Sequence, residues 1–243
     1  KESSVHIGIL ETGKLPGLLE QMFGNYSAMF SNLLSQLKID YTITTYEVTK
    51  FQLPDNPKEA DFWLITGSSF GVYDNLIWIA DLKNFVQEVI ENKVPLLGVC
   101  FGHQILAEAM GGSVEKSDKG WGVGVHKYYK VCDTVWAKRL GQSFSGYASH
   151  QDQVIIPPKN SISIYGSKFC PHSVLAYGNR DKPCAISIQS HPEFSKDCLK
   201  AIINRRLGKT LPRAVGEKGL KSLNQDPKNV EVFKVLLEAL HIN

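Results

Sequence analysis

Short apolar runs alternate with segments of helical periodicity over the first 112 residues of the chain. Buried strands are predicted, one of them with a partly alternating pattern, at residues 5–10, 41–48, 62–66 and 96–99. Apolar residues that recur every three or four positions predict amphipathic helices at residues 26–37, 78–90 and 101–110. Strands and helices that alternate at this spacing indicate a parallel, doubly wound sheet. Residues 11–25 are expected to form a long loop at the carboxyl end of the first strand, where such sheets bind ligands.

The pattern changes after residue 112. Short strand-like pieces separated by turns follow at residues 121–131, 143–150, 153–156, 161–165 and 173–177. They predict a smaller, mainly antiparallel extension. A buried strand at 184–189 and a helix at 196–207 complete the pattern. We therefore expect an α/β fold with a mostly parallel central sheet, flanking helices and this antiparallel extension.

The C-terminal part of the chain is predicted to belong to the same domain. A polar connection runs to Asp226, and an amphipathic helix with Pro227 in its first turn is expected at residues 227–240. We assign residues 1–207 to one domain and residues 208–243 to a helical extension packed on it. The polar stretch is either a docking segment or a surface connection, and we favour the surface connection.

Composition and charge argue against several classes of protein. With 43% hydrophobic and 21% charged residues, the 243-residue chain suits a globular fold with a sizeable core. Its 27 basic residues are scattered and the net charge is only +3, so nucleic-acid binding is not indicated. No apolar stretch approaches the roughly 20 residues of a membrane span. The chain as given shows no signal peptide, although an upstream one could have been removed.

The cysteines indicate reduced thiols in a cytoplasmic protein. There are five, an odd number, at positions 100, 132, 170, 184 and 198, and their spacing is not that of a metal site. The seven histidines show no ligand spacing with cysteines or carboxylates. We expect neither a metal site nor a cofactor.

Cys100 has a special context among these cysteines. It lies between the strand predicted at 96–99 and the helix predicted at 101–110, with Gly98 and Gly102 two residues to either side. This is the pattern of the Gly-x-Ser-x-Gly nucleophile elbow, with sulfur in place of the hydroxyl. The helix N-terminus favours a thiolate, and the backbone N–H of Phe101 is a candidate oxyanion donor. A lone cysteine is more often a buried structural residue, but strand, motif and helix together favour a nucleophile.

Further polar groups are predicted at the same edge of the sheet. His191 and Glu193 follow the strand at 184–189, and a histidine there could take the thiol proton while the carboxylate orients the imidazole. A structural histidine is the alternative reading. The Gly-Ser-Ser turn at 67–69 follows another buried strand, and it is either an anion-binding turn or an ordinary strand-to-helix loop.

Four motifs in this order carry a resemblance to a known family: Gly98-Val99-Cys100-Phe101-Gly102-His103-Gln104, Gly111-Gly112, Ser149-His150-Gln151-Asp152 and Gln189-Ser190-His191-Pro192-Glu193. They resemble the class I (triad) glutamine amidotransferases, in particular the glutaminase domain of GMP synthase and stand-alone relatives such as the γ-glutamyl peptidases. The resemblance covers roughly residues 5–207. The Cys motif and the His-Pro-Glu motif at this separation are highly specific.

The resemblance implies a flavodoxin-like fold and cleavage of the γ-amide of glutamine, or of a γ-glutamyl compound, through a Cys thioester. Cys100 would be the nucleophile, His191 the general base and then acid, and Glu193 the residue that orients it. The oxyanion hole would be formed by backbone N–H groups of Phe101, Gly67 and Ser68. The substrate-binding residues carried over by position are Gln104, Ser69, Ser149, His150, Gln151 and Asp152. From the residues alone, Gln104 could instead be a solvated helix residue and His150 a loop histidine.

The chain also departs from the family pattern. The usual Gly-Gly-Pro oxyanion loop reads Gly67-Ser68-Ser69-Phe70-Gly71, and no ATP-pyrophosphatase domain or Ser-Gly-Gly-x-Asp-Ser loop occurs in the chain. Three functions remain open. The first is a glutaminase that hands ammonia to a separate synthetase subunit, and the second is a stand-alone hydrolase of glutathione-like or other γ-glutamyl small molecules. The third, a non-catalytic binding module, is disfavoured because all three triad residues are present. We favour the first, with the second as the alternative.

Overall fold

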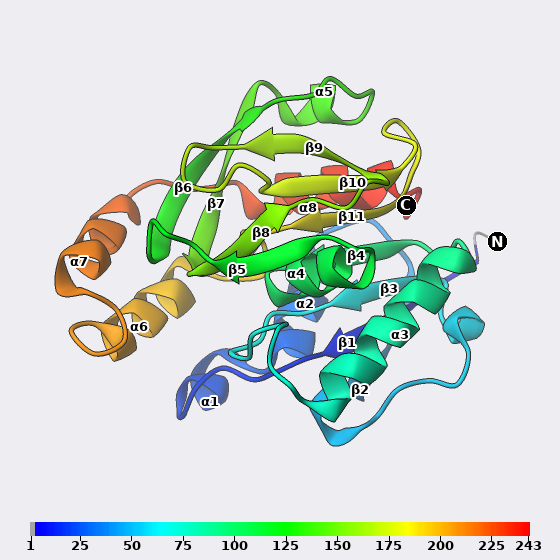
Figure 1. The fold of residues 1–243 in the computed structure, drawn as a ribbon, viewed down its shortest axis with the longest axis horizontal. Coiled ribbons are helices and arrows are strands. Elements are labelled where there is room, and N and C mark those ends of the chain that lie inside the picture. The colour runs from blue at the N-terminus through cyan, green and yellow to red at the C-terminus, as the bar shows by residue number, and fades with distance from the viewer. Residues whose placement is uncertain (1–2) are drawn as a thin grey trace.

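The computed structural model of the chain describes residues 3–243, and its core is a nine-stranded sheet (Figure 1). The strand order is β2-β1-β3-β4-β11-β10-β9-β6-β7. Neighbours from β2 to β11 pair in parallel, and neighbours from β11 to β7 pair antiparallel. The strands are β1 (Val5–Glu11), β2 (Tyr41–Glu47), β3 (Phe62–Ile65), β4 (Leu96–Val99), β6 (Gly122–Lys130), β7 (Ser143–His150), β9 (Ser161–Gly166), β10 (Val174–Gly178) and β11 (Pro183–Ile188). A separate antiparallel pair joins β5 (Ser113–Lys116) to β8 (Asp152–Ile156).

Helices cover both faces of the parallel half of the sheet. On one face Phe62 and Leu64 of β3 pack in a core with α2 and α8, while Trp63 and Ile65 of the same strand pack on the other face with α3 and α4. A strand that buries both faces explains the unbroken apolar run in its sequence. In Figure 1, α3 lies in front of the sheet and α8 behind it. The helices are α1 (Leu19–Phe23), α2 (Tyr26–Ser35), α3 (Ile77–Glu91), α4 (Phe101–Ala109), α5 (Ala137–Leu140), α6 (Lys196–Arg206), α7 (Arg213–Ser222) and α8 (Asn229–Ala239).

A third hydrophobic cluster lies beside the carboxyl ends of the parallel strands. It joins residues of α1, α2 and α6 to Tyr147 of β7 and Val123 of β6. The cluster brings α6, which follows β11, back against the first loop of the chain. That loop and α6 enclose the space above Cys100, as described below.

The predicted fold class is confirmed, with four differences in detail. The antiparallel half is continuous with the parallel half through β11, so both belong to one sheet. The prediction of a polar connection up to Asp226 was wrong, because α7 forms within it, and α1 forms within the expected loop at 11–25. The last helix begins at Asn229 after Lys228, so Pro227 precedes the helix and does not lie in its first turn.

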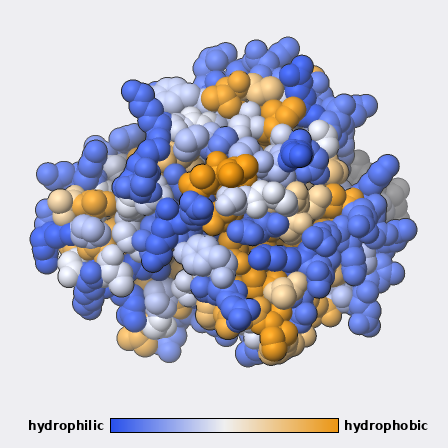
Figure 2. All heavy atoms as spheres, viewed as in Figure 1, coloured by the Kyte–Doolittle hydropathy of each residue, from blue (hydrophilic) through white to orange (hydrophobic). Residues whose placement is uncertain are grey.

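Most of the visible surface is polar, with a few apolar patches (Figure 2). Hydrophobic side chains gather over the start of α3, where Leu76 and Ile77 are exposed, and over β8, where Ile155 and Ile156 are exposed. Within residues 3–243, no helix is both long and apolar enough to cross a membrane.

Candidate active site

Cys100 lies at the junction of β4 and α4, as the sequence predicts. Its φ of 54° and ψ of −105° lie outside the regions that non-glycine residues favour. The Cys100 amide donates a hydrogen bond of 2.9 Å to the Ile188 carbonyl at the end of β11. Such a conformation persists only where the surrounding structure enforces it, and it is typical of functional sites.

Two glycines allow the chain to make this turn. A Cβ on Gly98 would lie 2.4 Å from the carbonyl oxygen of Gly102, and a Cβ on Gly102 would lie 2.4 Å from the carbonyl oxygen of Ile65 in β3. The first turn of α4 therefore packs directly on the strand ends. The N–H groups of that turn carry partial positive charge, and Cys100 is the N-cap residue of the helix.

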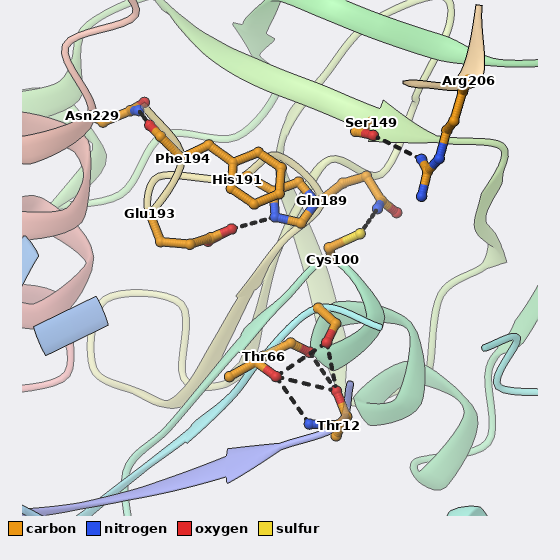
Figure 3. Close-up of polar contacts among 11 residues, drawn as sticks. Thr12, Thr66, Cys100, Ser149, Gln189, His191, Glu193, Phe194, Arg206 and Asn229 are labelled. Carbon is orange, nitrogen blue, oxygen red and sulfur yellow. Dashed lines mark hydrogen bonds and ion pairs between the residues drawn. The ribbon is translucent and has the colours of Figure 1, made fainter. Parts of the chain in front are cut away.

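His191 and Glu193 follow β11 and face Cys100 (Figure 3). The His191 amide donates to the Tyr147 carbonyl at 2.8 Å, and its ring stacks on Phe194 with centroids 4.0 Å apart and planes 4° from parallel. Nδ1 of the ring pairs with Oε1 of Glu193. Both side chains are buried. Backbone, stacking and ion pair together fix the imidazole in one orientation.

The charges around His191 favour its protonated form. Burial alone lowers its pKa, but the negative charges of Glu193 and of a Cys100 thiolate outweigh burial and raise the pKa to about 10. The other oxygen of the Glu193 carboxylate, Oε2, is buried and has no hydrogen-bond partner within residues 3–243. The site therefore favours the protonated imidazolium form of His191.

Gln189 connects the nucleophile to α4. Its Nε2 donates to the Cys100 sulfur at 3.5 Å, and its Oε1 accepts from Nε2 of Gln104 at 3.2 Å. The same Gln104 nitrogen donates to the carbonyl of Asp152 at 2.9 Å. Because the Asp152 carbonyl can only accept, Gln104 presents its NH2 group, which in turn makes Gln189 present an NH2 group to the sulfur.

The turn after β3 is held from below by two threonines (Figure 3). Thr12 Oγ1 donates to the Gly67 carbonyl at 2.9 Å and contacts the Thr66 carbonyl at 3.0 Å, and the Thr12 amide donates to Thr66 Oγ1 at 3.0 Å. In a trans peptide the C=O and the following N–H point in opposite directions. The Gly67 carbonyl points to Thr12, so the Ser68 N–H points away from Thr12 and is available to a ligand.

A small cavity of about 40 Å³ lies above Cys100. It is lined by Lys14, Leu15, Pro16, Tyr26, Ser68, Ser69, Cys100, Ser149, His191, Phe194, Ile202 and Arg206. A larger groove of about 410 Å³ lies between the end of α2 and α8, but its lining contains no hydroxyl or thiol nucleophile. The chemistry therefore points to the small cavity as the site.

Comparison with known families decides what kind of protein carries this site. The family model "Glutamine amidotransferase class-I" matches residues 21–207, well over half of the chain. The chain belongs to the class-I glutamine amidotransferase family. Members of this family are enzymes, and the chain is a glutamine amidotransferase-like hydrolase.

The relatives of this chain include two kinds of enzyme. Gamma-glutamyl peptidase 5 of Arabidopsis thaliana is 27% identical over 77% of this chain and 75% of its own length. A subunit of the glutamine-hydrolyzing GMP synthase of Methanococcus aeolicus is 27% identical over 71% of this chain and 85% of its own. A glutamine amidotransferase structure from Thermotoga maritima superposes with a TM-score of 0.74 at 18% identity, covering 98% of this chain and 99% of that one, which shows a shared fold.

The amidotransferase positions expected to bind substrate fall into two groups. Ser69 and Ser149 line the cavity with Cys100 and His191. The other four, Gln104, His150, Gln151 and Asp152, do not line the cavity and instead make hydrogen bonds within the protein. Nδ1 of His150 contacts the Asp152 carbonyl at 3.0 Å, and the Asp152 carboxylate accepts from the Tyr73 hydroxyl at 2.8 Å. The Gln151 carbonyl accepts from the Ser117 amide at 2.7 Å. The substrate roles of all six stay predictions.

Several residues of the amidotransferase site were missed by sequence reasoning. Thr12 and Thr66 had no signal, because they lie 54 positions apart and meet only when β1 and β3 pair. Gln189 stood in a quoted motif but received no role. Arg206 reaches the cavity from the end of α6, and nothing in its local sequence distinguishes it from Arg205 beside it.

Within residues 3–243, no group of three or more His, Cys, Asp or Glu side chains is arranged to hold a metal ion.

Proposed function

We propose that the protein hydrolyses a γ-glutamyl amide bond with Cys100 as nucleophile, His191 as general base and acid, and Glu193 as the group that orients His191. The observation that carries the proposal is the placement of the His191 ring between the Glu193 carboxylate and the Cys100 sulfur, with the sulfur on a strained elbow. This is the geometry of a nucleophile, its base and an orienting acid.

The reaction proceeds in two halves. The Cys100 thiolate attacks the γ-carbonyl carbon, and the resulting oxyanion accepts hydrogen bonds from the backbone N–H groups of Phe101 and of the turn at Gly67 and Ser68. The protonated His191 then gives its proton to the departing nitrogen, which leaves a γ-glutamyl thioester on the sulfur. Neutral His191 next takes a proton from water, which attacks the thioester and releases glutamate and the Cys100 thiolate.

Glutamine is the substrate that we propose first, with ammonia as the second product. A relative named as one of the subunits of GMP synthase supports a partner for this chain, a separate synthetase that would receive the ammonia. The second candidate is a stand-alone γ-glutamyl peptidase, which several relatives named as gamma-glutamyl peptidases favour. The two candidates differ only in the leaving group, and the same three side chains and backbone N–H groups would serve either reaction.

We also propose a cytoplasmic location. All five cysteines are free thiols in the structure, and reduced thiols are typical of that compartment. Cys100 in particular must stay reduced to act as a nucleophile.

A side-by-side hydrolysis assay tests the proposal. The isolated chain is offered glutamine, glutathione and a γ-glutamyl anilide, with Cys100→Ala as the blank and Cys132→Ala as the matched control. We expect Cys100→Ala to lose turnover and Cys132→Ala to keep it. Glu193→Gln should slow turnover less than His191→Ala, because Glu193 orients the base and transfers no proton.

The outcomes separate the candidates. Activity on glutamine alone, or only after a synthetase is added, supports the amidotransferase. Fast cleavage of the bulkier compounds supports the peptidase. Hydrolysis retained by a folded Cys100→Ala protein would overturn the assignment of the nucleophile.

A further inference from the structure

Arg206 brings a positive charge to the wall of the catalytic cavity. It is the last residue of α6, and its side chain lines the same cavity as Cys100 and His191. Its Nη1 donates to the Ser149 hydroxyl on β7 at 3.4 Å, and its guanidinium lies 5.5 Å from the centre of the Trp121 ring (Figure 3 shows the Ser149 contact). These two contacts aim the guanidinium but use only part of its five N–H donors.

No carboxylate neutralises this charge. Within residues 3–243, no Asp or Glu oxygen lies within 4.0 Å of an Arg206 nitrogen. Lys14, the other cation in the cavity lining, differs in this respect because its ammonium contacts Glu20 at 3.8 Å and Glu47 at 3.6 Å. Burial lowers the pKa of Arg206, yet a guanidinium stays charged at neutral pH. A half-buried guanidinium with no carboxylate partner is free to bind an anionic group of a ligand.

We propose that Arg206 binds a carboxylate of the substrate while Cys100 attacks its γ-carbonyl group. This inference rests on the proposed function, since it concerns the same cavity. The planar guanidinium matches a carboxylate in a bidentate geometry, and the Ser149 hydroxyl beside it can donate a further hydrogen bond. Two carboxylates have this chemistry in a γ-glutamyl peptide: the α-carboxylate of the glutamyl group and the carboxylate of a peptide leaving group.

Steady-state kinetics distinguish the two sources. The substrates are γ-glutamylglycine, which carries both carboxylates, and γ-glutamyl methylamide, which carries only the α-carboxylate. The variants are Arg206→Met, Arg206→Lys and, as control, Lys200→Met, which removes one exposed positive charge from the same helix. We expect Arg206→Met to raise KM by about tenfold or more, the usual effect of losing a charged hydrogen bond, with kcat changed far less. Arg206→Lys should restore part of the loss.

The pattern of KM assigns the carboxylate. A rise for both substrates identifies the α-carboxylate, and a rise for γ-glutamylglycine alone identifies the leaving group. KM values of Arg206→Met within about twofold of those of Lys200→Met for both substrates would overturn the proposal, since a lost charged hydrogen bond costs more than this.

A second readout is independent of hydrolysis. Iodoacetamide alkylates Cys100 without any substrate, and L-glutamate or glycine bound in the cavity should slow this reaction. We expect at least one of them to protect the wild-type protein and Lys200→Met, and to protect Arg206→Met only at about tenfold higher concentration. Equal protection of all three proteins, or of none, would contradict the proposal. If no γ-glutamyl compound is hydrolysed either by the isolated chain or after a synthetase is added, the proposed function fails, and this readout still decides whether Arg206 binds a carboxylate.

Discussion

Gln189 shows how a single buried residue holds Cys100, the proposed nucleophile, in place. Its amide joins the Cys100 sulfur to Gln104, and through Gln104 to the Asp152 carbonyl. Gln189 and Gln104 are almost completely buried, so this chain of donors is protected from water. Hydrogen bonds in such surroundings are stronger than in water and costly to leave unsatisfied. We therefore propose that Gln189 positions the Cys100 side chain.

We predict that Gln189→Glu weakens the nucleophile. A carboxylate in place of the amide would repel a Cys100 thiolate, and the hydrogen bond from the Gln189 amide to the sulfur would be lost. Alkylation of Cys100 by iodoacetamide at pH 7 should therefore slow about tenfold. The pH profile of alkylation should also move to higher pH. Asn84→Asp, which makes the same kind of change at an exposed position on α3, is the control. If Gln189→Glu and Asn84→Asp alkylate with the same pH profile, Gln189 does not act on the sulfur.

The proximity of Cys100, His191 and Glu193 could be predicted from the sequence, and the contacts of the residues around them could not. Each of the three lies in a short motif directly after a predicted strand, and such a motif can be recognised in the sequence alone. Gln104 and Gln189 are 85 positions apart, and their contact depends on the pairing of β4 with β11. Side-chain contacts that depend on strand pairing leave no local pattern.

Helix α7 packs closely on β6 through glycines. Its buried residues are Gly216 and Gly219, and a Cβ on Gly219 would lie 3.0 Å from the Val123 carbonyl oxygen of β6. The Ser222 hydroxyl accepts from the Val125 amide at 2.8 Å. Val215 and Leu220 of α7 pack partly buried against the third hydrophobic cluster, but its buried residues are glycines, which add nothing to an apolar periodicity.

We predict that Gly124→Ala displaces α7 from β6. Gly124 has a φ of 97°, and a Cβ there would lie 2.3 Å from the Ser222 hydroxyl oxygen and 2.7 Å from Gly219 Cα. The free energy of unfolding should fall by about 1–3 kcal/mol, and limited proteolysis should cut faster between residues 208 and 226. Gly120→Ala is the control, because its φ of 77° carries similar strain but no atom lies within 4 Å of the new Cβ. Equal stability and proteolysis of the two variants would show that the helix contact is unimportant.

Across the whole molecule, buried histidines link stability to pH. Burial lowers the pKa of His103, His126, His150 and His172, to about 3 for His103 and His150. Between pH 6.5 and 3 the unfolded chain therefore binds more protons than the folded protein at His103 and His150. These two histidines destabilise the folded protein as pH falls through this range.

We predict that His150→Asn makes the protein less sensitive to acid. The free energy of unfolding should decrease less steeply below pH 6.5 than in the wild type, by about 1.4 kcal/mol per pH unit. Asparagine can still donate a hydrogen bond to the Asp152 carbonyl. Urea unfolding at pH 6.5 and 4.5 measures this slope. The control is His241→Asn at an exposed position with a φ of 60°, which asparagine tolerates. A slope in His150→Asn equal to that of the wild type would contradict the assignment.

For the whole molecule, the sequence predicted that helices cover both faces of the sheet better than it predicted how far the sheet extends. The apolar runs of β1, β3, β4 and β11 required a sheet covered on both faces, and the structure has one. That the antiparallel strands continue the same sheet depends on the pairing of β10 with β11, which no local pattern specifies. Helix α8 packs in the core with α2, although the division into residues 1–207 and 208–243 stays a prediction.

The covalent intermediate is the most direct test of the proposed chemistry. The protein is mixed with glutamine and with γ-glutamylglycine, quenched in acid within one turnover, digested and examined by mass spectrometry. The account predicts one γ-glutamyl group on the peptide that contains Cys100, lost again when the quench is delayed past turnover, and absent in Cys100→Ala. Hydrolysis that proceeds with the γ-glutamyl group on another residue, or with no adduct at any quench time, would contradict it.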